Sequence, residues 1–404
     1  MDDNQKSIRN IIASEALFAS EAAEYLGISV QRLNQLVHSK KIEPVKLSRA
    51  GSLFLKSDLD DRLKEVDLPK QETKAGPPAL HYCNSKIVQE AINYAAIQSA
   101  LNISDKKTTP LFQELRTAVE ITEPLLNYLG DVSRVLEIGR ELIEKAYDKT
   151  IRGFSELKPT DFILKRGEDR YPELLDRTEE APPYLFLRGN IDLLHENAIA
   201  VVGTRNPSPE GEKRAAALGM LLGKYKMVVA SGLAKGIDSA AHQGALASKN
   251  FTIAVIGTPL TKVYPKENQK LQQQIEEAGL VVSQFSPGST IQRWNFPLRN
   301  ATMSGISLAT VIVEAGETSG ALIQANYALK QGRYVFIPQS ALQNPNLKWP
   351  QKYIQHKGAE SFGKIEELIN KLEISHVIGD SSIASKAISL FEMEADSDYV
   401  HRSK

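Results

Sequence analysis

The sequence predicts an α/β fold for its larger part: a Rossmann-like, doubly wound and mostly parallel sheet over residues 151–375, preceded by a small winged helix-turn-helix and a helical region. Three observations support this prediction. Short apolar runs alternate with helical segments, the runs are too continuous for half-exposed strands, and loops rich in glycine follow several of them. The apolar runs are residues 198–202, 227–230, 252–256, 280–283, 310–313 and 334–337.

Length and composition limit the class of protein. A chain of 404 residues predicts two or three domains. Lysine plus arginine and aspartate plus glutamate number 49 each, so any surface for a polyanion must come from local clustering of cations. The single cysteine, Cys83, cannot form an internal disulfide, and no thiolate zinc site is indicated. With no run of about 18 apolar residues, we expect a cytoplasmic protein that does not span a membrane.

Residues 1–67 predict a winged helix-turn-helix. A helix over 20–27 precedes a second over 28–38, and two short strands, 40–46 and 53–55, flank a turn at Arg49. The segment resembles the DNA-binding modules of the MerR and excisionase type, which implies that the second helix enters the major groove. The candidate contacts to duplex DNA are Arg32, Asn34, Gln35, Lys40, Lys41 and Arg49. A helical adaptor is the alternative interpretation.

Residues 68–150 predict a linker and a helical region. Proline, lysine, glutamate and glycine without an apolar period indicate a linker up to Pro78, and helical spacing of apolar residues begins near residue 85. No chemical group stands out there, so we expect a packing or partner role. Residues 376–404 form a polar tail that we expect to be partly helical or loose.

Two loops in the α/β part predict an anion site. The first predicted strand leads into Gly203, Thr204 and Arg205, where a glycine, a hydroxyl and a guanidinium suit phosphate oxygens. The second leads into a loop with small residues and one lysine, which contributes the candidates Ser231, Gly232, Lys235 and Gly236. The further glycines of a dinucleotide loop are missing, which argues against a nicotinamide or flavin cofactor. For one loop alone, glycines that only make a tight turn are an equally good explanation.

Two later segments add candidates. Arg299 and Asn300 follow the aromatic residues Trp294 and Phe296, for which we favour a role as core side chains over base stacking. Ser319 and Gly320 precede a predicted helix, whose first amides can face a phosphate.

Several motifs in one order resemble the DprA/Smf family of DNA-processing proteins between about residues 160 and 340. They are Val201–Arg205, Ser231–Asp238 with His242, Tyr264–Pro265 with Asn268, Phe296–Asn300 with Ser304–Gly305, and Glu314–Ala315 with Ser319–Gly320. The resemblance implies single-stranded DNA bound on the Rossmann-like domain, a homodimer, and transfer of the strand to a RecA-type recombinase during transformation. It also implies phosphate contacts by Arg205, Ser231, Gly232 and Lys235.

Two other functions compete with this interpretation. Related folds sense nucleotides, so the loops could bind a small phosphorylated ligand while the winged helix reads duplex DNA, as in a transcriptional regulator or a defence sensor. Others cleave nucleoside monophosphates, but the loop Glu314–Gly320 lacks the Pro-Gly-Gly-x-Gly-Thr pattern of that class. Glu314, Glu317 and Asp238 are better explained as caps or solvated carboxylates. We therefore expect a DNA-binding protein that is not an enzyme, with no catalytic residue, cofactor or metal.

Overall fold

The computed structural model describes residues 15–26, 28, 30, 33, 36–37, 42–48, 51–65, 80 and 83–375. The predicted linker over residues 68–78, the tail over 376–404 and all six duplex candidates lie outside these residues. Those candidates are Arg32, Asn34, Gln35, Lys40, Lys41 and Arg49. Within the part of the chain that is described, no helix combines the length and the apolar character needed to cross a membrane.

The N-terminal module has its own small core. An antiparallel sheet in the order β1-β3-β2 packs with helices α2 and α4. Its elements are β1 Ala16–Phe18, α2 Ala19–Leu26, β2 Lys46–Ser48, β3 Gly51–Leu55 and α4 Lys56–Glu65. Leu33, Leu36, Phe54 and Leu59 are buried together. The predicted hairpin is present, although its first strand lies closer to the turn than expected, and β1 adds a strand that the sequence pattern did not indicate.

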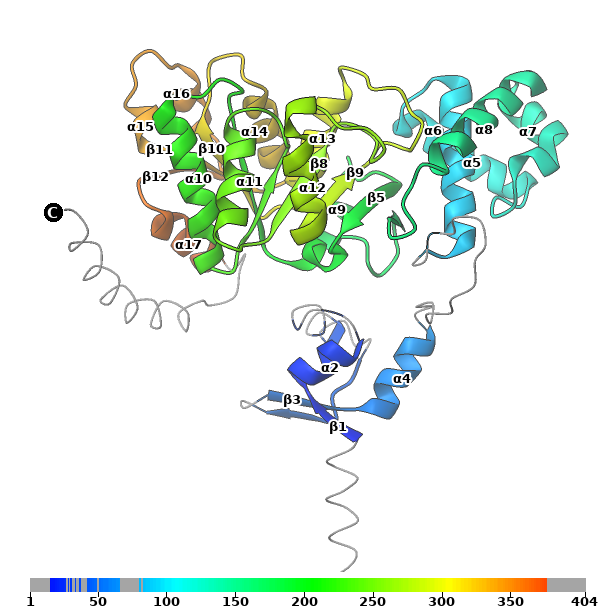
Figure 1. Ribbon diagram of the computed structural model, residues 1–404, viewed down its shortest axis with the longest axis horizontal. Coiled ribbons are helices and arrows are strands. Elements are labelled where there is room, and N and C mark those ends of the chain that lie inside the picture. The colour runs from blue at the N-terminus through cyan, green and yellow to red at the C-terminus, as the bar shows by residue number, and fades with distance from the viewer. Residues whose placement is uncertain are drawn as a thin grey trace, which may run out of the picture.

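A helical region follows at one end of the larger part. It consists of α5 Ser85–Leu101, α6 Asp105–Ala118, η1 Leu125–Tyr128, α7 Leu129–Leu136 and α8 Arg140–Phe154. The side chain of Asn84 accepts a hydrogen bond from the Lys86 amide and so caps α5, and Asn102 ends that helix in the left-handed conformation. In Figure 1 these helices gather beside β5 and β9.

The main sheet confirms the predicted doubly wound α/β fold. Its nine strands run in the order β12-β11-β10-β6-β7-β8-β9-β5-β4, and the seven from β12 to β9 are parallel. The six predicted strands are β6 Ala198–Gly203, β7 Val228–Ser231, β8 Thr252–Ile256, β9 Leu280–Ser283, β10 Ala309–Glu314 and β11 Tyr334–Pro338. Three further strands were not predicted: the parallel edge strand β12 Ala359–Phe362 and the antiparallel pair β4 Phe162–Lys165 and β5 Tyr184–Gly189.

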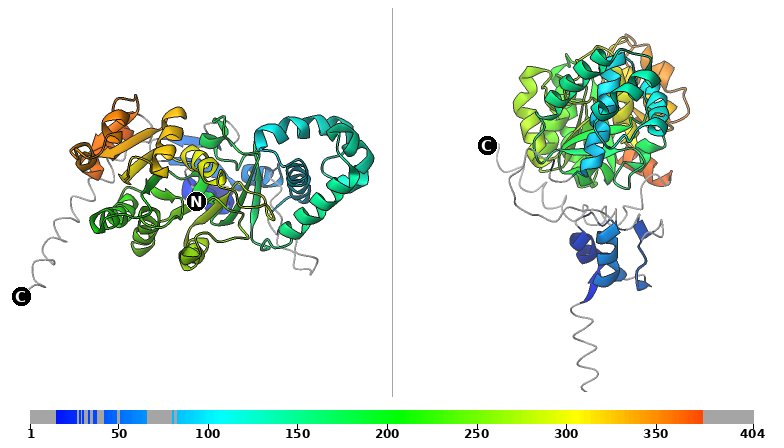
Figure 2. Two further views of the ribbon diagram at one scale, coloured as in Figure 1. Left: turned by 90° about the horizontal axis from the view of Figure 1, so that it is seen from above. Right: turned by 90° about the vertical axis from the view of Figure 1, so that its right-hand side faces the viewer.

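Helices cover both faces of the sheet, as the views in Figure 2 show. Successive strand residues point to opposite faces, so Ala200 and Val202 join one apolar core while Ile199 and Val201 join another. The helices are α9 Glu173–Asp176, α10 Pro209–Lys224, α11 Ile237–Ala247, α12 Gln269–Ala278, α13 Asn295–Gly305, α14 Gly320–Lys330, α15 Gln339–Leu342, α16 Trp349–Tyr353 and α17 Ile365–Ile374. The parallel strands are therefore buried on both sides, as their continuous apolar sequence predicts.

The helical region and the sheet share one apolar core. Residues of α5 and α8 are buried in the same cluster as Phe186, Ala254 and Val281 of the sheet. A Cβ added at Gly153 on α8 would lie 2.4 Å from the Gly288 Cα, so the two backbones touch. Lys165 on β4 also forms an ion pair of 2.8 Å with the buried carboxylate of Glu90 on α5. These contacts fix the helices against the sheet.

The close packing of α10 on α11 generates the first prediction. A Cβ at Gly244 would lie 2.0 Å from the Ala216 carbonyl oxygen, which belongs to a helix backbone and cannot move aside. Gly244→Ala should lower the free energy of unfolding by about 2 kcal/mol, because overpacking outweighs the helix propensity gained. Urea unfolding measures the change. Gly316→Ala, where nothing described lies within 4 Å, is the control; equal stability of the two variants would contradict the packing argument.

The second prediction concerns His242, the buried histidine on α11. His242 Nδ1 lies 2.7 Å from Thr252 Oγ1, whose hydroxyl donates to the Val229 carbonyl, so the proton is assigned to Nδ1. Burial lowers the pKa of His242 to about 3. The unfolded state therefore binds a proton that the folded state excludes between about pH 3 and 6.5, and the stability gained is complete only above this window.

From pH 7 to 5 this group should remove about 2 kcal/mol of stability. The measurement is the free energy of unfolding at both pH values for the wild type and for His242→Leu. We expect a shallower pH dependence in the variant; identical slopes would show that His242 does not contribute.

Candidate nucleic-acid interface

A cleft lies where the order of the parallel strands reverses. From β6 the chain continues to β7, β8 and β9, which lie on one side of β6 in the sheet. β10 pairs with β6 on the opposite side, so the loops that follow β6 and β10 diverge at this point. Open α/β sheets bind ligands at this point. The cleft measures about 360 Å³, and we call it the switch-point cleft. Among the predicted site residues it is lined by Gly203, Thr204, Arg205, Arg299, Asn300, Ser319 and Gly320.

The glycines of the first two loops serve to bring these loops together. A Cβ at Gly203 would lie 2.7 Å from the Glu314 carbonyl oxygen, and one at Gly236, where φ is 78°, would lie 2.6 Å from the Thr204 carbonyl oxygen. The Ile237 amide also donates to the Thr204 oxygen at 3.3 Å. Close backbone packing in tight turns is therefore enough to explain these glycines. Any anion site must depend on the side chains that the loops present.

Arg299 is a buried cation in the lining of the cleft. Its guanidinium is buried and donates to the carbonyl oxygens of Gly232 and Val255, the latter at 2.6 Å, and to the side chain of Asn300. Burial lowers the pKa of Arg299, the nearby Asp238 carboxylate raises it, and the charge of Arg205 lowers it again. An anion between Arg205 and Arg299 would relieve their repulsion.

Asp238 lies beneath the second loop rather than at a helix cap. It belongs to the first turn of α11, whose N-cap is Gly236, and its Oδ2 accepts from the Ala234 amide at 3.3 Å. Burial raises the pKa of Asp238, and the positive charge of Arg299 opposes that rise. The carboxylate therefore balances one buried cation and stabilises the loop.

Aromatic residues extend the cleft along one side. The Arg205 guanidinium lies 6.0 Å from the ring centre of Phe296, and that ring lies 5.4 Å from the ring of the exposed Tyr264. Trp294 is 60% exposed, so its interpretation as a core side chain is wrong. In the sequence Tyr264 stands out only as part of a family motif, because its partner Phe296 is more than thirty residues away along the chain.

Glu314 positions the first loop. Its carboxylate accepts from the Ser208 amide at 2.9 Å and from the Ser208 hydroxyl at 2.6 Å, and the same hydroxyl accepts from Gly211 to cap α10. Ser319 caps α14 through the Ala321 amide at 3.3 Å. Two helix N-termini therefore lie at this edge of the sheet, and that of α14 borders the cleft.

Four predicted residues do not line the cleft. Ser231 is fully buried and its hydroxyl donates to the Val201 carbonyl at 2.6 Å, so phosphate binding by this side chain does not fit the structure. Gly232 is buried against the Arg299 guanidinium, and Gly236 packs on the first loop. Lys235 is exposed beside the cleft, and it forms a 2.6 Å ion pair with Glu267.

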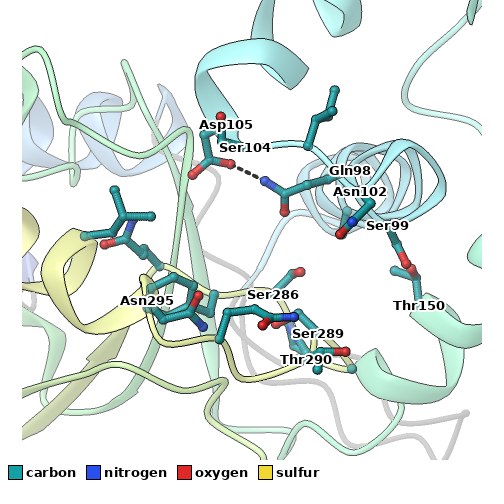
Figure 3. A pocket seen from close by; sticks show the side chains of 18 of the residues that line it. Gln98, Ser99, Asn102, Ser104, Asp105, Thr150, Ser286, Ser289, Thr290 and Asn295 are labelled. Carbon is teal, nitrogen blue, oxygen red and sulfur yellow. Dashed lines mark hydrogen bonds between the residues drawn. The ribbon is translucent and has the colours of Figure 1, made fainter.

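A second pocket of about 470 Å³ lies between the helical region and the sheet. Figure 3 shows Gln98, Asn102 and Asp105 from the helices facing Ser286, Ser289, Thr290 and Asn295 across it. We call it the seam pocket. Within the described part of the chain, no group of three or more His, Cys, Asp or Glu residues could hold a metal ion.

Comparisons with known proteins agree with this architecture. Residues 162–373 match the family model of DNA recombination-mediator protein A, and residues 19–66 match a helix-turn-helix domain. The DNA processing protein DprA of Bacillus subtilis is 35% identical over 258 residues, which are 63% of this chain and 86% of that protein. The corresponding protein of Streptococcus pneumoniae is 43% identical over 176 residues, 43% of this chain and 62% of its own length, which is less than two thirds.

The X-ray structure of the pneumococcal DprA superposes with a TM-score of 0.54 at 29% identity and covers 74% of this chain and 98% of that one. The family model spans more than half of the sequence, and the motifs that carry the resemblance, from Val201 to Gly320, lie within it. The chain therefore belongs to the DNA recombination-mediator protein A family, the DprA/Smf proteins, and carries a helix-turn-helix domain before its family core.

Proposed function

We propose that this chain binds single-stranded DNA at the switch-point cleft and takes part in DNA processing without itself catalysing a reaction. The observation that carries the proposal is the meeting of Arg205, the buried Arg299 and the α14 N-terminus around one cleft bordered by aromatic rings. Cations and helix amides suit phosphates, and the faces of Phe296 and Tyr264 suit unpaired bases. The names of the family, DNA recombination-mediator protein A, and of its relatives, DNA processing protein DprA, support a role on DNA.

Local rather than global charge supports this binding mode. The chain has no net charge, so binding depends on cations placed by the fold at one edge of the sheet. Arg205 is the exposed cation of the cleft, whereas Arg299 is committed to two backbone carbonyls. We therefore assign the direct phosphate contact to Arg205 and a positioning role to Arg299. Lys235 extends the footprint once its pair with Glu267 opens.

The proposal has two further parts. Transfer of the strand to a RecA-type recombinase in DNA uptake, and a homodimer as the binding form, follow from the family resemblance. The N-terminal helix-turn-helix domain is proposed to read duplex DNA. A ligand-gated regulator is the second candidate, because a cleft of about 360 Å³ is within the range of small-molecule sites.

Arg205→Ala should weaken binding of labelled oligothymidine at least tenfold. It should also flatten the dependence of log affinity on log salt by about 0.7, the value for one phosphate contact on a single strand. Fluorescence anisotropy at several salt concentrations measures both. Arg134→Ala, at an exposed arginine on α7 that pairs with Asp131, is the control. An unchanged slope in Arg205→Ala would remove this residue from the footprint.

Removal of residues 1–79 should leave binding to single strands within about twofold and abolish specific binding to duplex DNA. The cut is placed there because the helical region shares its core with the sheet, while the N-terminal module buries a separate cluster. Anisotropy titrations with oligothymidine and with a mixed-sequence duplex compare the two forms. Duplex binding that needs the module, together with no single-strand binding by either form, would favour the regulator.

A further inference from the structure

The seam pocket has the lining of a site for a neutral, planar, hydrogen-bonding ligand. Amide and hydroxyl side chains dominate it, and among its lining residues only Asp105 and Lys149 carry charge. Its volume of about 470 Å³ is within the usual range for small ligands. Trp294, which is largely exposed, offers an aromatic face at its edge. None of the residues assigned to phosphate binding lines this pocket.

Several polar atoms in the wall have no partner among the described residues. Ser289 Oγ is buried and makes no hydrogen bond. The Asn295 side chain, on a residue only 4% exposed, donates to and accepts from no other described group. Asp105 accepts from Gln98 and Tyr94 through Oδ1 alone, which leaves Oδ2 for another donor. Buried polar groups are normally paired, so the Ser289 hydroxyl, together with the unused polar atoms of Asn295 and Asp105, favours an occupant with both donors and acceptors.

The two walls are held in place before any ligand arrives. Gln98, Asn102 and Asp105 lie at the α5–α6 junction, and the opposite wall is the loop from Gln284 to Trp294. Backbone contact between Gly153 and Gly288 joins the walls at one side, and the shared core lies beneath. A rigid gap is suited to a flat ligand.

The seam pocket also adjoins the switch-point cleft. The first turn of α13 separates them: Trp294, Asn295 and Leu298 line the seam pocket, whereas Phe296, Pro297 and Arg299 line the cleft. A chain of nucleotides held at the cleft can therefore reach the seam pocket by passing over this turn.

We propose that the seam pocket receives a nucleobase, with Asp105, Gln98 and Asn295 contacting its edge and Trp294 stacking on its face. The base comes either from the strand bound at the cleft or from a free nucleoside. Only the first source rests on the proposed function. Base recognition outside a duplex commonly combines an aromatic face with hydrogen bonds to the base edge.

The first experiment uses tryptophan fluorescence of the full chain titrated with each of the four deoxynucleosides. The chain has two tryptophans, and Trp349 is buried with its Nε1 bonded to the Ala315 carbonyl. We expect a saturable change that persists in Trp349→Phe and disappears in Trp294→Phe. Ser99→Phe and Thr290→Phe, which fill the pocket from opposite walls at exposed positions, should abolish it. Gln113→Phe, on the exposed surface of α6 outside the pocket, should not.

The second experiment compares oligothymidine with a base-depleted strand of equal length, which keeps the sugars and phosphates and carries no bases. If the strand supplies the base, Ser99→Phe and Thr290→Phe weaken oligothymidine binding roughly five- to a hundredfold, the range that stacking one base contributes. They leave the salt slope unchanged, because phosphate contacts remain, and they bind the base-depleted strand as the wild type does.

The outcomes separate the two proposals. A nucleoside response with unaffected strand binding assigns the pocket to free nucleosides, and weakened strand binding assigns it to the strand. Normal strand binding in both filled variants together with no nucleoside response overturns the inference. If the wild type binds no single strand, the proposed function fails, and the nucleoside titration alone then decides whether the seam pocket binds a base.

Discussion

The buried guanidinium of Arg299 is the interaction on which the geometry of the cleft depends. A charged group without water must find partners within the protein, and Arg299 finds them in the Gly232 carbonyl after β7, in the Val255 carbonyl of β8 and in the nearby Asp238 carboxylate. The loop after β7 is thereby tied to the carboxyl end of β8 and to α13. Because α13 also presents Phe296 to Arg205, one buried cation sets the distance between the outer cation and the aromatic side of the cleft.

Much of the fold could be predicted because buried parallel strands have an unmistakable sequence. All six continuous apolar runs are strands of the main sheet. In the missed strands β4 and β5 the apolar run ends at a basic residue, and β12 contains no such run. β5 contains Arg188, which is buried only because it pairs with Asp161 at 2.6 Å, and β12 is a short edge strand with two polar residues. The pairing that makes these segments strands is not visible in their own residues.

The candidate site divides in the same way. The cleft residues that directly follow a strand could be predicted from the sequence, because the carboxyl ends of parallel strands lie at one edge of the sheet. The sequence could not show which of these side chains are available to a ligand. The Ser231 hydroxyl bonds to a backbone carbonyl within the sheet, Arg299 bonds to backbone carbonyls, and Trp294 is exposed to solvent. The seam pocket could not be predicted from the sequence, because its walls come from segments about 190 residues apart, one of which has no motif that indicates a function.

The backbone contact between Gly153 and Gly288 also affects how the protein unfolds. With helices and sheet sharing one core, residues 83–375 should unfold as a single cooperative unit, and exchange of amide hydrogens in α5 should report the same opening free energy as β8. The N-terminal module, with its own small cluster, should melt separately and earlier. Heat or denaturant would then unfold the N-terminal module while residues 83–375 remain folded, so the two parts are separable in thermodynamics as well as in sequence.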